Sequence, residues 1–504
     1  MYKIFQGFHL VEAYHELKKA KRLAKNQTVA RGIKLAVAIV VALVLWFLPS
    51  DAFGIEGLTV IEQRLISIFV FATLMWVLEA IPAWTTSVLI VVLLLLSVSD
   101  SSLWLFTQGF SPEELGQMVK YKSIMHCFAD PIIMLFIGGF ILAIAATKSG
   151  LDVLLARVML RPFGTQSRYV LLGFILVTAV FSMFLSNTAT AAMMLTFLTP
   201  VLKALPADGK GKIGLAMAIP VAANVGGMGT PIGTPPNAIA LKYLNNPEGL
   251  NLNIGFGEWM SFMLPYTLVI LFIAWVILLR LFPFKQKTIQ LNIVGEVRKD
   301  WRSIVVYITF AITVLLWVFD KFTGVNSNVV AMIPVAVFCV TGIITKRDLE
   351  EISWSVLWMV AGGFALGVAL QETGLAQHMI EAIPFDTWSP VLMIVGSGLI
   401  CYAMANFISH TATAALLVPI LAIAGSSMRE NLAGLGGVET LLIGVAIGSS
   451  LAMILPISTP PNALAHATGM IQLKDMEKVG LVMGLIGLLL GYTMLVILGS
   501  NGWL

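Results

Sequence analysis

Long apolar segments follow one another along the whole chain and leave no polar stretch long enough for a water-soluble domain. A helix of about 20 apolar residues spans the hydrocarbon core of a bilayer, where only helices and closed barrels satisfy their backbone groups. Charged residues make up 12% of the 504 residues, about half the share found in soluble domains. The sequence therefore predicts an all-α polytopic membrane protein and excludes an ordinary soluble enzyme. The apolar segments lie at about 34–49, 62–81, 83–99, 126–149, 168–205, 212–245, 259–280, 303–320, 326–344, 356–373, 388–424, 438–470 and 478–499.

The positions of lysine and arginine predict which segments face the cytoplasm. Residues 1–33 form a basic arm and the polar linker 281–302 is also basic, whereas 246–258 contains no lysine or arginine. Because cytoplasmic loops carry the excess of these residues, we expect a cytoplasmic N-terminus and linker, and a C-terminus on the outside. The net charge of +4 is small. We expect the arm to lie on anionic lipid. We do not expect nucleic acid as a partner.

Three sequence blocks occur twice in the same order, 224, 223 and 225 positions apart. This regular offset indicates an internal duplication, which is typical of many secondary transporters. The first repeat, together with the N-terminal helix, is predicted at 34–280 and the second at 303–504. The blocks are LFIGGFILAIAATKSGL from Leu135 with MVAGGFALGVALQETGL from Met359, FLSNTATAAMM from Phe184 with FISHTATAALL from Phe407, and GTPPN from Gly233 with STPPN from Ser458.

Two apolar segments, 168–205 and 388–424, are too long for one crossing and have a polar triplet near the middle. Basic residues flank both ends of the first segment, while the approach to the second has none. We therefore expect two re-entrant hairpins that enter from opposite sides, with the triplets S-N-T and S-H-T at their tips. The other segments predict about eleven transmembrane helices, and the two repeats then have inverted topology.

A second polar break in each repeat contains two adjacent prolines. The T-P-P-N sequences at 234–237 and 459–462 lie inside the apolar segments 212–245 and 438–470. Because proline lacks the backbone N–H and clashes with the preceding helical turn, we expect two broken helices at the midplane. Such breaks are tolerated only where they are buried or line a cavity, and the helix ends there offer N–H groups to anions and carbonyl oxygens to cations.

The composition of these breaks suits a small anion bound together with cations. Neither hairpin contains an acidic residue, and the second carries no formal charge. An anion would be held by helix N-termini, hydroxyls and amides, and a hard cation such as Na⁺ by serine, asparagine and carbonyl oxygens. His410 stands where the first repeat has Asn187. A protonated imidazole at that position would add a fixed positive charge.

Motifs of other protein classes are missing from the sequence. It contains no G-x-x-x-x-G-K-[ST] motif for nucleotide binding, no spacing typical of a metal centre, and no nucleophile elbow in a suitable setting. We therefore expect neither an enzyme nor a cofactor, apart from Na⁺ as a coupling ion. Broken helices also occur in channels, so a channel is one alternative. A membrane-embedded enzyme is the other.

The paired motifs resemble those of the divalent anion:sodium symporter family of di- and tricarboxylate transporters. The resemblance rests on SNTATAAMM at 186–194, SHTATAALL at 409–417, GTPPN at 233–237 and STPPN at 458–462, and it extends over roughly 60–500. It implies a transporter of small dicarboxylates of the malate, succinate or 2-oxoglutarate type in the cell membrane. It also implies a homodimer in which a transport domain moves, as an elevator, against a fixed scaffold domain.

The resemblance further implies which residues bind. The first Na⁺ site would use Ser182, Ser186, Asn187 and Gly233, and the second would use Ser409 and Ser458. Substrate contacts would come from Asn187, Thr188, Thr234, Pro235, His410, Thr411, Thr459 and Pro460.

This sequence departs from the family pattern in the second repeat. His410 stands where the family usually has asparagine, and Ala405 where it tends to have a hydroxyl. Both changes remove oxygen ligands from the second site, and His410 can supply a positive charge in place of the cation. We therefore favour exchange of one dicarboxylate for another. The alternatives are Na⁺-coupled symport of a di- or tricarboxylate and, on the same scaffold, transport of an inorganic anion such as sulfate or arsenite.

Overall fold

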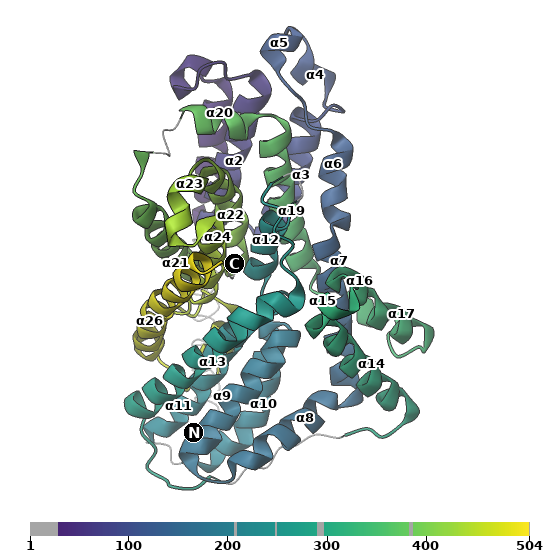
Figure 1. Cartoon of the computed structure of the whole chain (residues 1–504), viewed down its shortest axis with the longest axis vertical. Coiled ribbons are helices and arrows are strands. Elements are labelled where there is room, and N and C mark those ends of the chain that lie inside the picture. The colour runs from purple at the N-terminus through teal and green to yellow at the C-terminus, as the bar shows by residue number, and fades with distance from the viewer. Residues whose placement is uncertain (1–28, 206–208, 247–248, 290–296, 383–386, 503–504) are drawn as a thin grey trace, which may run out of the picture. The chain divides into compact units, whose positions relative to one another are not determined.

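The computed structural model describes residues 29–205, 209–246, 249–289, 297–382 and 387–502 (Figure 1). Most of the predicted basic arm 1–33 and part of the predicted linker 281–302 lie outside these residues. In the described part of the chain, extended pairing is confined to two isolated bridges, Ser99 with Val119 and Gln166 with Thr288. All longer elements there are helices, which confirms the predicted all-α fold.

Nine helices among the described residues are long and apolar enough to cross a membrane, or ten if the bent pair Arg429–Leu435 and Gly437–Ser450 counts as one span. The predicted number of about eleven also includes the shorter apolar helices Ala83–Ser97 and Ser327–Val340. Two of the nine are limbs of the predicted hairpins. The nine are Val29–Phe47, Val60–Leu78, Tyr121–Ser149, Ser167–Phe184, Phe256–Leu281, Trp301–Val318, Trp354–Glu372, His410–Ser427 and Leu473–Ser500.

The first of two compact units contains residues up to Ile124 together with Val368–His378. The helix α2 begins after Thr59, whose hydroxyl accepts from the Glu62 N–H while the Glu62 carboxylate accepts from the Thr59 N–H. This capping box satisfies two of the free donors at the helix start. The helices of this unit are Val29–Phe47, η1 (Ser50–Phe53), α2 (Val60–Leu78), α3 (Ala83–Ser97), α4 (Trp104–Thr107) and α5 (Pro112–Leu115).

The second compact unit, Met125–Gly367 with Met379–Leu504, contains both copies of the hairpin blocks and of the T-P-P-N blocks. Each copy has the same order of four helices, with a short break between the first and second and another between the third and fourth. The first copy consists of α9 (Ser167–Phe184), α10 (Asn187–Ala204), α11 (Lys210–Gly227) and α12 (Pro235–Leu244). The second consists of α21 (Ser397–Phe407), α22 (His410–Ser427), α24 (Gly437–Ser450) and α25 (Pro460–Ala467).

The packing of the two copies is pairwise equivalent. Within the first copy α9 and α10 both pack against α11, and within the second α21 and α22 both pack against α24; α9, α10 and α11 lie side by side in Figure 1. Between the copies, α10 packs against α25 as α12 does against α22, and α11 packs against α25 as α12 does against α24. The second limb of each hairpin therefore contacts the helix that follows the T-P-P-N break of the other copy.

The remaining helices lie before, between and after these two copies, and α6, α19 and α20 belong partly to each compact unit. Tyr266 of α13 donates to the Gly487 carbonyl oxygen of α26 at 2.8 Å and so ties the end of the first copy to the end of the second. These helices are α6 (Tyr121–His126), η2 (Cys127–Ala129), α7 (Pro131–Ser149), α8 (Leu151–Leu160), η3 (Arg161–Phe163), α13 (Phe256–Leu281), α14 (Trp301–Val318), α15 (Asp320–Thr323), α16 (Ser327–Val330), α17 (Met332–Val340), α18 (Lys346–Glu350), α19 (Trp354–Glu372), α20 (Leu375–Ala382), η5 (Leu392–Gly396), α23 (Arg429–Leu432), η6 (Ala433–Leu435) and α26 (Leu473–Ser500).

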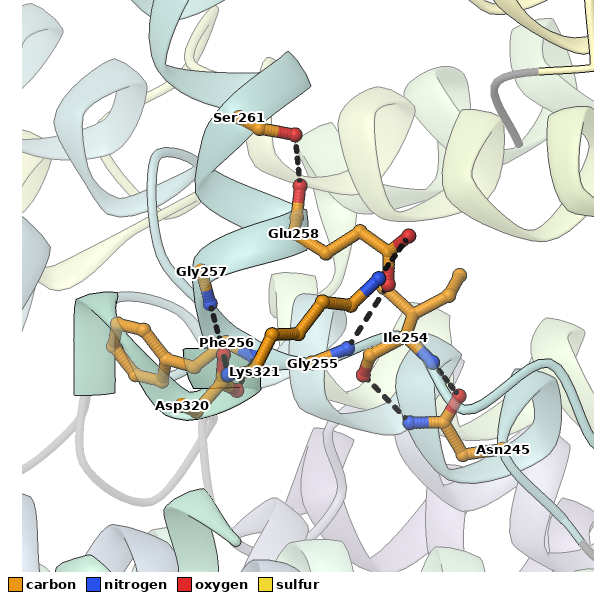
Figure 2. A network of polar contacts seen from close by, with 9 residues as sticks. All are labelled: Asn245, Ile254, Gly255, Phe256, Gly257, Glu258, Ser261, Asp320 and Lys321. Carbon is orange, nitrogen blue, oxygen red and sulfur yellow. Dashed lines mark hydrogen bonds and ion pairs between the residues drawn. The ribbon is translucent and has the colours of Figure 1, made fainter. Parts of the chain in front are cut away.

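A polar network joins α13 to α15 between the two copies (Figure 2). The carboxylate of Asp320 accepts from the Phe256 N–H at 2.6 Å and from the Gly257 N–H at 3.4 Å. Lys321 pairs with Glu258 at 2.8 Å. A carboxylate at a helix N-terminus satisfies free N–H groups and interacts favourably with the helix dipole. Asp320 therefore fixes the start of α13.

Candidate functional site

The two hairpin tips are turns of the same kind. In each, the first limb ends and a serine then caps the second limb: Ser186 Oγ accepts from the Ala189 N–H and Ser409 Oγ from the Ala412 N–H, both at 3.2 Å. The predicted tip triplets thus begin at the N-cap and continue into the first turn of α10 and α22. First-turn N–H groups have no partner within their own helix, so each tip presents backbone donors.

The T-P-P-N sequences start helices, whereas we expected their prolines to interrupt them. Pro235 and Pro460 are the first residues of α12 and α25, with Thr234 and Thr459 as the N-caps. In the first turn the missing N–H of proline costs nothing, because that group has no helical partner. The breaks themselves are the preceding loops, 228–234 and 451–459, of which the first is buried throughout.

The asparagine of each T-P-P-N sequence holds the loop before it. Asn237 Nδ2 lies 2.8–3.3 Å from three carbonyl oxygens of its own copy, and Asn462 Nδ2 lies 2.9–3.1 Å from two. Both side chains are fully buried. These amides satisfy backbone acceptors that no helix provides for. The acceptors belong to Gly227, Met228 and Thr230 in the first copy and to Met453 and Leu455 in the second.

Asn224 of α11 connects the first copy to the second. Its Nδ2 lies 3.3 Å from Thr459 Oγ1 and 3.1 Å from Asn462 Oδ1. Because Asn462 directs its own Nδ2 to carbonyl groups, its oxygen must face Asn224, which fixes the orientation of both amides. The equivalent of Asn224 is Ser449, whose hydroxyl donates to the α24 backbone. The bridge is therefore made by the first copy to the second and not in the reverse direction among the described residues. Asn237 Oδ1, the counterpart of Asn462 Oδ1, has no hydrogen-bond partner there.

Three oxygen atoms lie close together near the first hairpin tip, and they share too few hydrogen atoms for both short contacts to be hydrogen bonds. Ser182 Oγ lies 2.6 Å from Asn187 Oδ1 and 2.7 Å from the Ala223 carbonyl oxygen. A hydroxyl group has one hydrogen and can donate it to only one of these acceptors. Such clusters of oxygen atoms suit hard cations. The structure thus brings together Ser182 and Asn187, two of the four residues predicted for the first Na⁺ site.

Gly227 lets Asn187 and Gly233 approach its backbone closely. A Cβ atom at Gly227 would lie 2.7 Å from Asn187 Oδ1 and 3.0 Å from the Gly233 carbonyl oxygen. Asn187 and Gly233, another predicted residue, therefore both lie against Gly227, and a side chain there would collide with them. The equivalent position in the second copy is Ala452, which is fully buried and carries a methyl group.

The second predicted cation site is built differently. Ala405 is fully buried and supplies no oxygen, but the Oδ1 of the next residue, Asn406, accepts from the Ile454 N–H at 2.8 Å. Ser458 Oγ donates to the Asn406 carbonyl oxygen at 3.0 Å. Asn406 thus brings an oxygen atom to this region beside the position where Ala405 lacks one. The Ser458 hydroxyl already donates a hydrogen bond within the protein, and both Asn406 oxygens already accept one.

His410 binds a backbone carbonyl group at the second tip. Its Nε2 lies 2.6 Å from the Ala452 carbonyl oxygen, and because a carbonyl oxygen only accepts, Nε2 must carry the hydrogen. The first-copy equivalent of this carbonyl, at Gly227, accepts from Asn237 Nδ2 instead. His410 and Thr411 are both buried. The same backbone carbonyl is therefore bound by the imidazole of the tip in the second copy and by the amide of the T-P-P-N sequence in the first.

An open cavity of about 730 Å³ reaches the first hairpin tip. Residues of α7 and α8 line one part of it, and Ser186, Thr188 and following residues of α10 line another. Small-molecule sites in proteins occupy about 300–1,000 Å³. Ser409 and Thr411 of the second tip are not among the lining residues, so the cavity gives access to one tip.

Four charged residues line this cavity: Lys148, Asp152, Arg298 and Glu351. Lys148 also pairs with Asp348 at 2.7 Å. Burial alone would raise the pKa of Asp348, but hydrogen bonds from Lys148 and Thr345 outweigh burial and hold that pKa below its ordinary value. Burial raises the pKa of Asp152. The cavity walls thus carry two basic and two acidic side chains.

Three residues of this region were given no role from the sequence: Asn224, Asn406 and Thr230. Thr230 donates to the Met183 carbonyl oxygen and accepts from the Gly233 N–H, so it holds the first loop as Ser458 holds the second. A comparison of the two copies residue by residue would have singled out Asn224 and Thr230. Each is polar where its equivalent, Ser449 or Leu455, is smaller or apolar.

Known proteins resemble the chain over most of its length. It is 29% identical over 480 residues to an uncharacterized transporter of Haemophilus influenzae, which covers 90% of this chain and 95% of that protein. It is 28% identical over 533 residues to the sodium-dependent dicarboxylate transporter SdcS of Staphylococcus aureus, covering 97% of this chain and 95% of that protein. The SdcS protein of Staphylococcus saprophyticus is also 28% identical, with 92% and 91% covered.

A solved structure shares the fold. The YdaH transporter of Alcanivorax borkumensis aligns with a TM-score of 0.54 at 14% identity, covering 83% of this chain and 98% of that one. The family model described as the sodium:sulfate symporter transmembrane region matches residues 29–504, nearly the whole chain. The chain therefore belongs to the divalent anion:sodium symporter family and is a multi-pass membrane transporter.

Proposed function

We propose that this protein is a secondary active transporter of small dicarboxylates. Its family and the two SdcS relatives, which are named as sodium-dependent dicarboxylate transporters, support this substrate class. The observation that carries the proposal is the pair of equivalent hairpin tips, each capped by a serine and followed by a threonine. Helix N-termini bind carboxylates through free N–H groups and the helix dipole. Two such tips match the two charged ends of a dicarboxylate.

The substrate would contact the first turns of α10 and α22. Asn187 and Thr188 supply one set of groups and His410 and Thr411 the other, with both hairpins free of acidic residues that would repel an anion. Thr234 and Thr459, with Pro235 and Pro460, would close the site from the other two helix starts. Because these prolines lack N–H groups, α12 and α25 offer fewer donors than α10 and α22, and their contacts would be mainly through the threonines.

The first copy would hold the coupling cation. Ser182 and Asn187 bring their oxygen atoms together, the Gly233 carbonyl oxygen lies nearby against Gly227, and Ser186 caps the adjoining helix. Na⁺ bound there would supply positive charge next to one substrate carboxylate. Asn187 belongs to both groups of residues, so its side chain would link cation and substrate binding.

The second copy would work without a cation. The His410 Nε2–H donates to the carbonyl oxygen of Ala452, and Ala452 carries a methyl group where the first copy has Gly227. Ser409 and Ser458, which were predicted as its ligands, already serve as a helix cap and a loop contact. We propose that His410 replaces the second cation. This supports dicarboxylate exchange, or symport with fewer Na⁺ ions, over symport that uses two complete Na⁺ sites.

We further propose that the protein acts as a homodimer in the cell membrane, with its N-terminus in the cytoplasm, and alternates access by an elevator movement. A charged site without ligand resists crossing the bilayer because an uncompensated charge in hydrocarbon is costly. Substrate binding at the tips would remove that barrier. The movement would therefore be coupled to occupancy.

Uptake into proteoliposomes tests this function. Labelled succinate is offered with and without external Na⁺, to vesicles that are empty or loaded with unlabelled dicarboxylate. Saturable uptake that C4 and C5 dicarboxylates inhibit, and sulfate does not, supports the substrate class; inhibition by sulfate or arsenite alone would refute it. Uptake that needs internal substrate indicates exchange, whereas Na⁺-dependent uptake into empty vesicles indicates symport.

The role of His410 has its own test. His410→Asn restores the family residue, and we expect it to increase the Na⁺ dependence of uptake. The reciprocal variant Asn187→His is the matched control and should reduce Na⁺ dependence, because it brings an imidazole to the first cluster. If His410→Asn shows the Na⁺ dependence of the parent, the proposed replacement is wrong.

A further inference from the structure

Arg64 of α2 is a buried cation. Its side chain lies in the first compact unit and the residue is 5% exposed. Among the described residues no carboxylate lies within ion-pair distance of it, and its hydrogen bond there is a donation to the Ser97 carbonyl oxygen at 3.3 Å. Buried charges are normally paired, because removing an ion from water costs several kcal/mol even after relaxation. Arg64 therefore needs another source of stabilisation.

Three aromatic rings surround this guanidinium. Its central carbon lies 5.5 Å from the ring centres of Trp46 and Phe106 and 5.6 Å from that of Phe110. Trp46 and Phe106 also contact each other edge to face at 5.7 Å. A cation–π contact contributes about 0.5–2 kcal/mol, and the three rings offer no oxygen or nitrogen acceptor to the guanidinium N–H groups. The N–H groups in its plane stay available for an acceptor.

The donors of Arg64 exceed the acceptors around it. A guanidinium carries five N–H groups in a fixed, planar fork, and the Ser97 carbonyl oxygen accepts one of them. None of the nitrogen atoms of Arg64 is among the buried side-chain atoms that lack a partner. The other nitrogen atoms of Arg64 have no hydrogen-bond partner in the described part of the chain, so they must keep some exposed surface.

The surroundings of Arg64 are those of a membrane interface. Phe47, Trp104 and Leu105 are 78%, 69% and 64% exposed, and Phe110, one of the three rings, is 43% exposed. These residues belong to the end of the Val29–Phe47 helix and to the stretch around α4, both next to the rings that surround the guanidinium. Aromatic side chains gather at the level of lipid headgroups. The most abundant anionic group at that level is the phosphate of the lipid headgroups.

We propose that Arg64, held among Trp46, Phe106 and Phe110, binds the phosphate group of an anionic phospholipid. The planar fork of arginine matches the oxygens of a phosphate and binds them through two parallel, charge-assisted hydrogen bonds. The bound phosphate supplies the missing counter-charge, and the acyl chains lie against the exposed apolar residues. The site consists of residues of the first compact unit and does not depend on the identity of the substrate.

Thermal unfolding of the purified full-length protein in detergent tests this site. Dioleoyl phosphatidylglycerol is titrated against dioleoylglycerol, which has the same chains without phosphate, and against inorganic phosphate. We expect phosphatidylglycerol to raise the unfolding temperature of the parent protein and Arg64→Gln to weaken that response about tenfold or more, as the loss of charge-assisted bonds requires. The matched control is Arg168→Gln, because the Arg168 guanidinium also lies over an aromatic ring, Tyr169, at 4.6 Å.

Each outcome decides the proposal. Equal responses of Arg64→Gln and the parent, or an equal effect of dioleoylglycerol, would overturn it. Stabilisation by inorganic phosphate with the same dependence on Arg64 would overturn the assignment to a lipid. If Arg64→Gln does not fold, Arg64→Lys decides: it keeps the charge but lacks the fork, so a weaker response to phosphatidylglycerol supports the site, and a response equal to that of the parent refutes it.

Discussion

Replacing Gly233 by alanine tests how tightly the first break is built. A Cβ atom at Gly233 would overlap the carbonyl oxygen of Gly227 and lie 2.9 Å from its Cα atom. Both atoms belong to the backbone, so neither moves without the loop. That loop is held by the bond from Asn237 Nδ2 to the Gly227 carbonyl oxygen at 3.1 Å. The methyl group therefore cannot be accommodated by a simple change of rotamer.

The cost follows from two contributions. Overpacking a well-filled interior costs about 1–3 kcal/mol. Displacement of Gly227 also weakens its hydrogen bond with Asn237, which contributes about 0.5–1.5 kcal/mol. We therefore expect Gly233→Ala to lower the free energy of unfolding by about 2–4 kcal/mol. The second copy avoids this conflict, because the equivalent residue Ser458 already carries a side chain.

Two measurements check this prediction: thermal unfolding in detergent and the Na⁺ dependence of succinate uptake. Since the Gly233 carbonyl oxygen is a proposed cation ligand, half-saturation by Na⁺ should rise about tenfold, which corresponds to about 1.4 kcal/mol. Gly229→Ala is the matched control, because a Cβ there first meets the flexible end of Met183 at 3.0 Å. If both variants unfold at the same temperature and need the same Na⁺ concentration, the reasoning is refuted.

Three further changes test other parts of the structure. Asp320→Asn should cost about 1–2 kcal/mol by weakening the cap of α13, seen as a lower unfolding temperature, and Asp320→Glu, which keeps the charge, should lose less. Asn224→Ala should cost about 1–3 kcal/mol by leaving Asn462 Oδ1 without its donor, and it should lower uptake. If Ser449→Ala, at the equivalent position, lowers uptake equally, the effect does not come from the Asn224 bridge. The depressed pKa of Asp348 stabilises the folded state above the ordinary carboxyl pKa, and that contribution is lost as the pH falls through the lowered value. Asp348→Asn should therefore unfold at a lower temperature than the parent at pH 7, with a difference that disappears in acid; a difference independent of pH would contradict this.

The sequence was a good guide to the hairpin tips and the breaks, because a polar group inside an apolar segment is costly unless the helix ends there and the group caps it. Ser186 and Ser409 are helix caps, as short hydroxyl residues at helix starts usually are. Both predicted breaks are present, but each lies just before the prolines, for a physical reason. Inside a helix they break it, but in the first turn they favour it, and the sequence alone does not say which turn Pro235 occupies.

The bridging side chains could not be predicted, because their partners are remote in sequence. Asn224 and Asn462 are 238 positions apart, and Asn406 and Ile454 are 48 positions apart. Local patterns carry no information about such pairs. The internal duplication does carry some: a polar residue in one copy that is replaced in the other indicates a contact that breaks the symmetry, as Asn224 and Ser449 do.

The exchange of contacts between the copies has a consequence for the protein as a gene product. Since α10 packs against α25 and α12 against α22, neither half encloses its own tip. A polypeptide severed between α13 and α14 would yield two fragments that each expose the surface meant for the other. The two fragments should regain function only when they are produced together, because each half of the native chain supplies the packing surface that the other half needs.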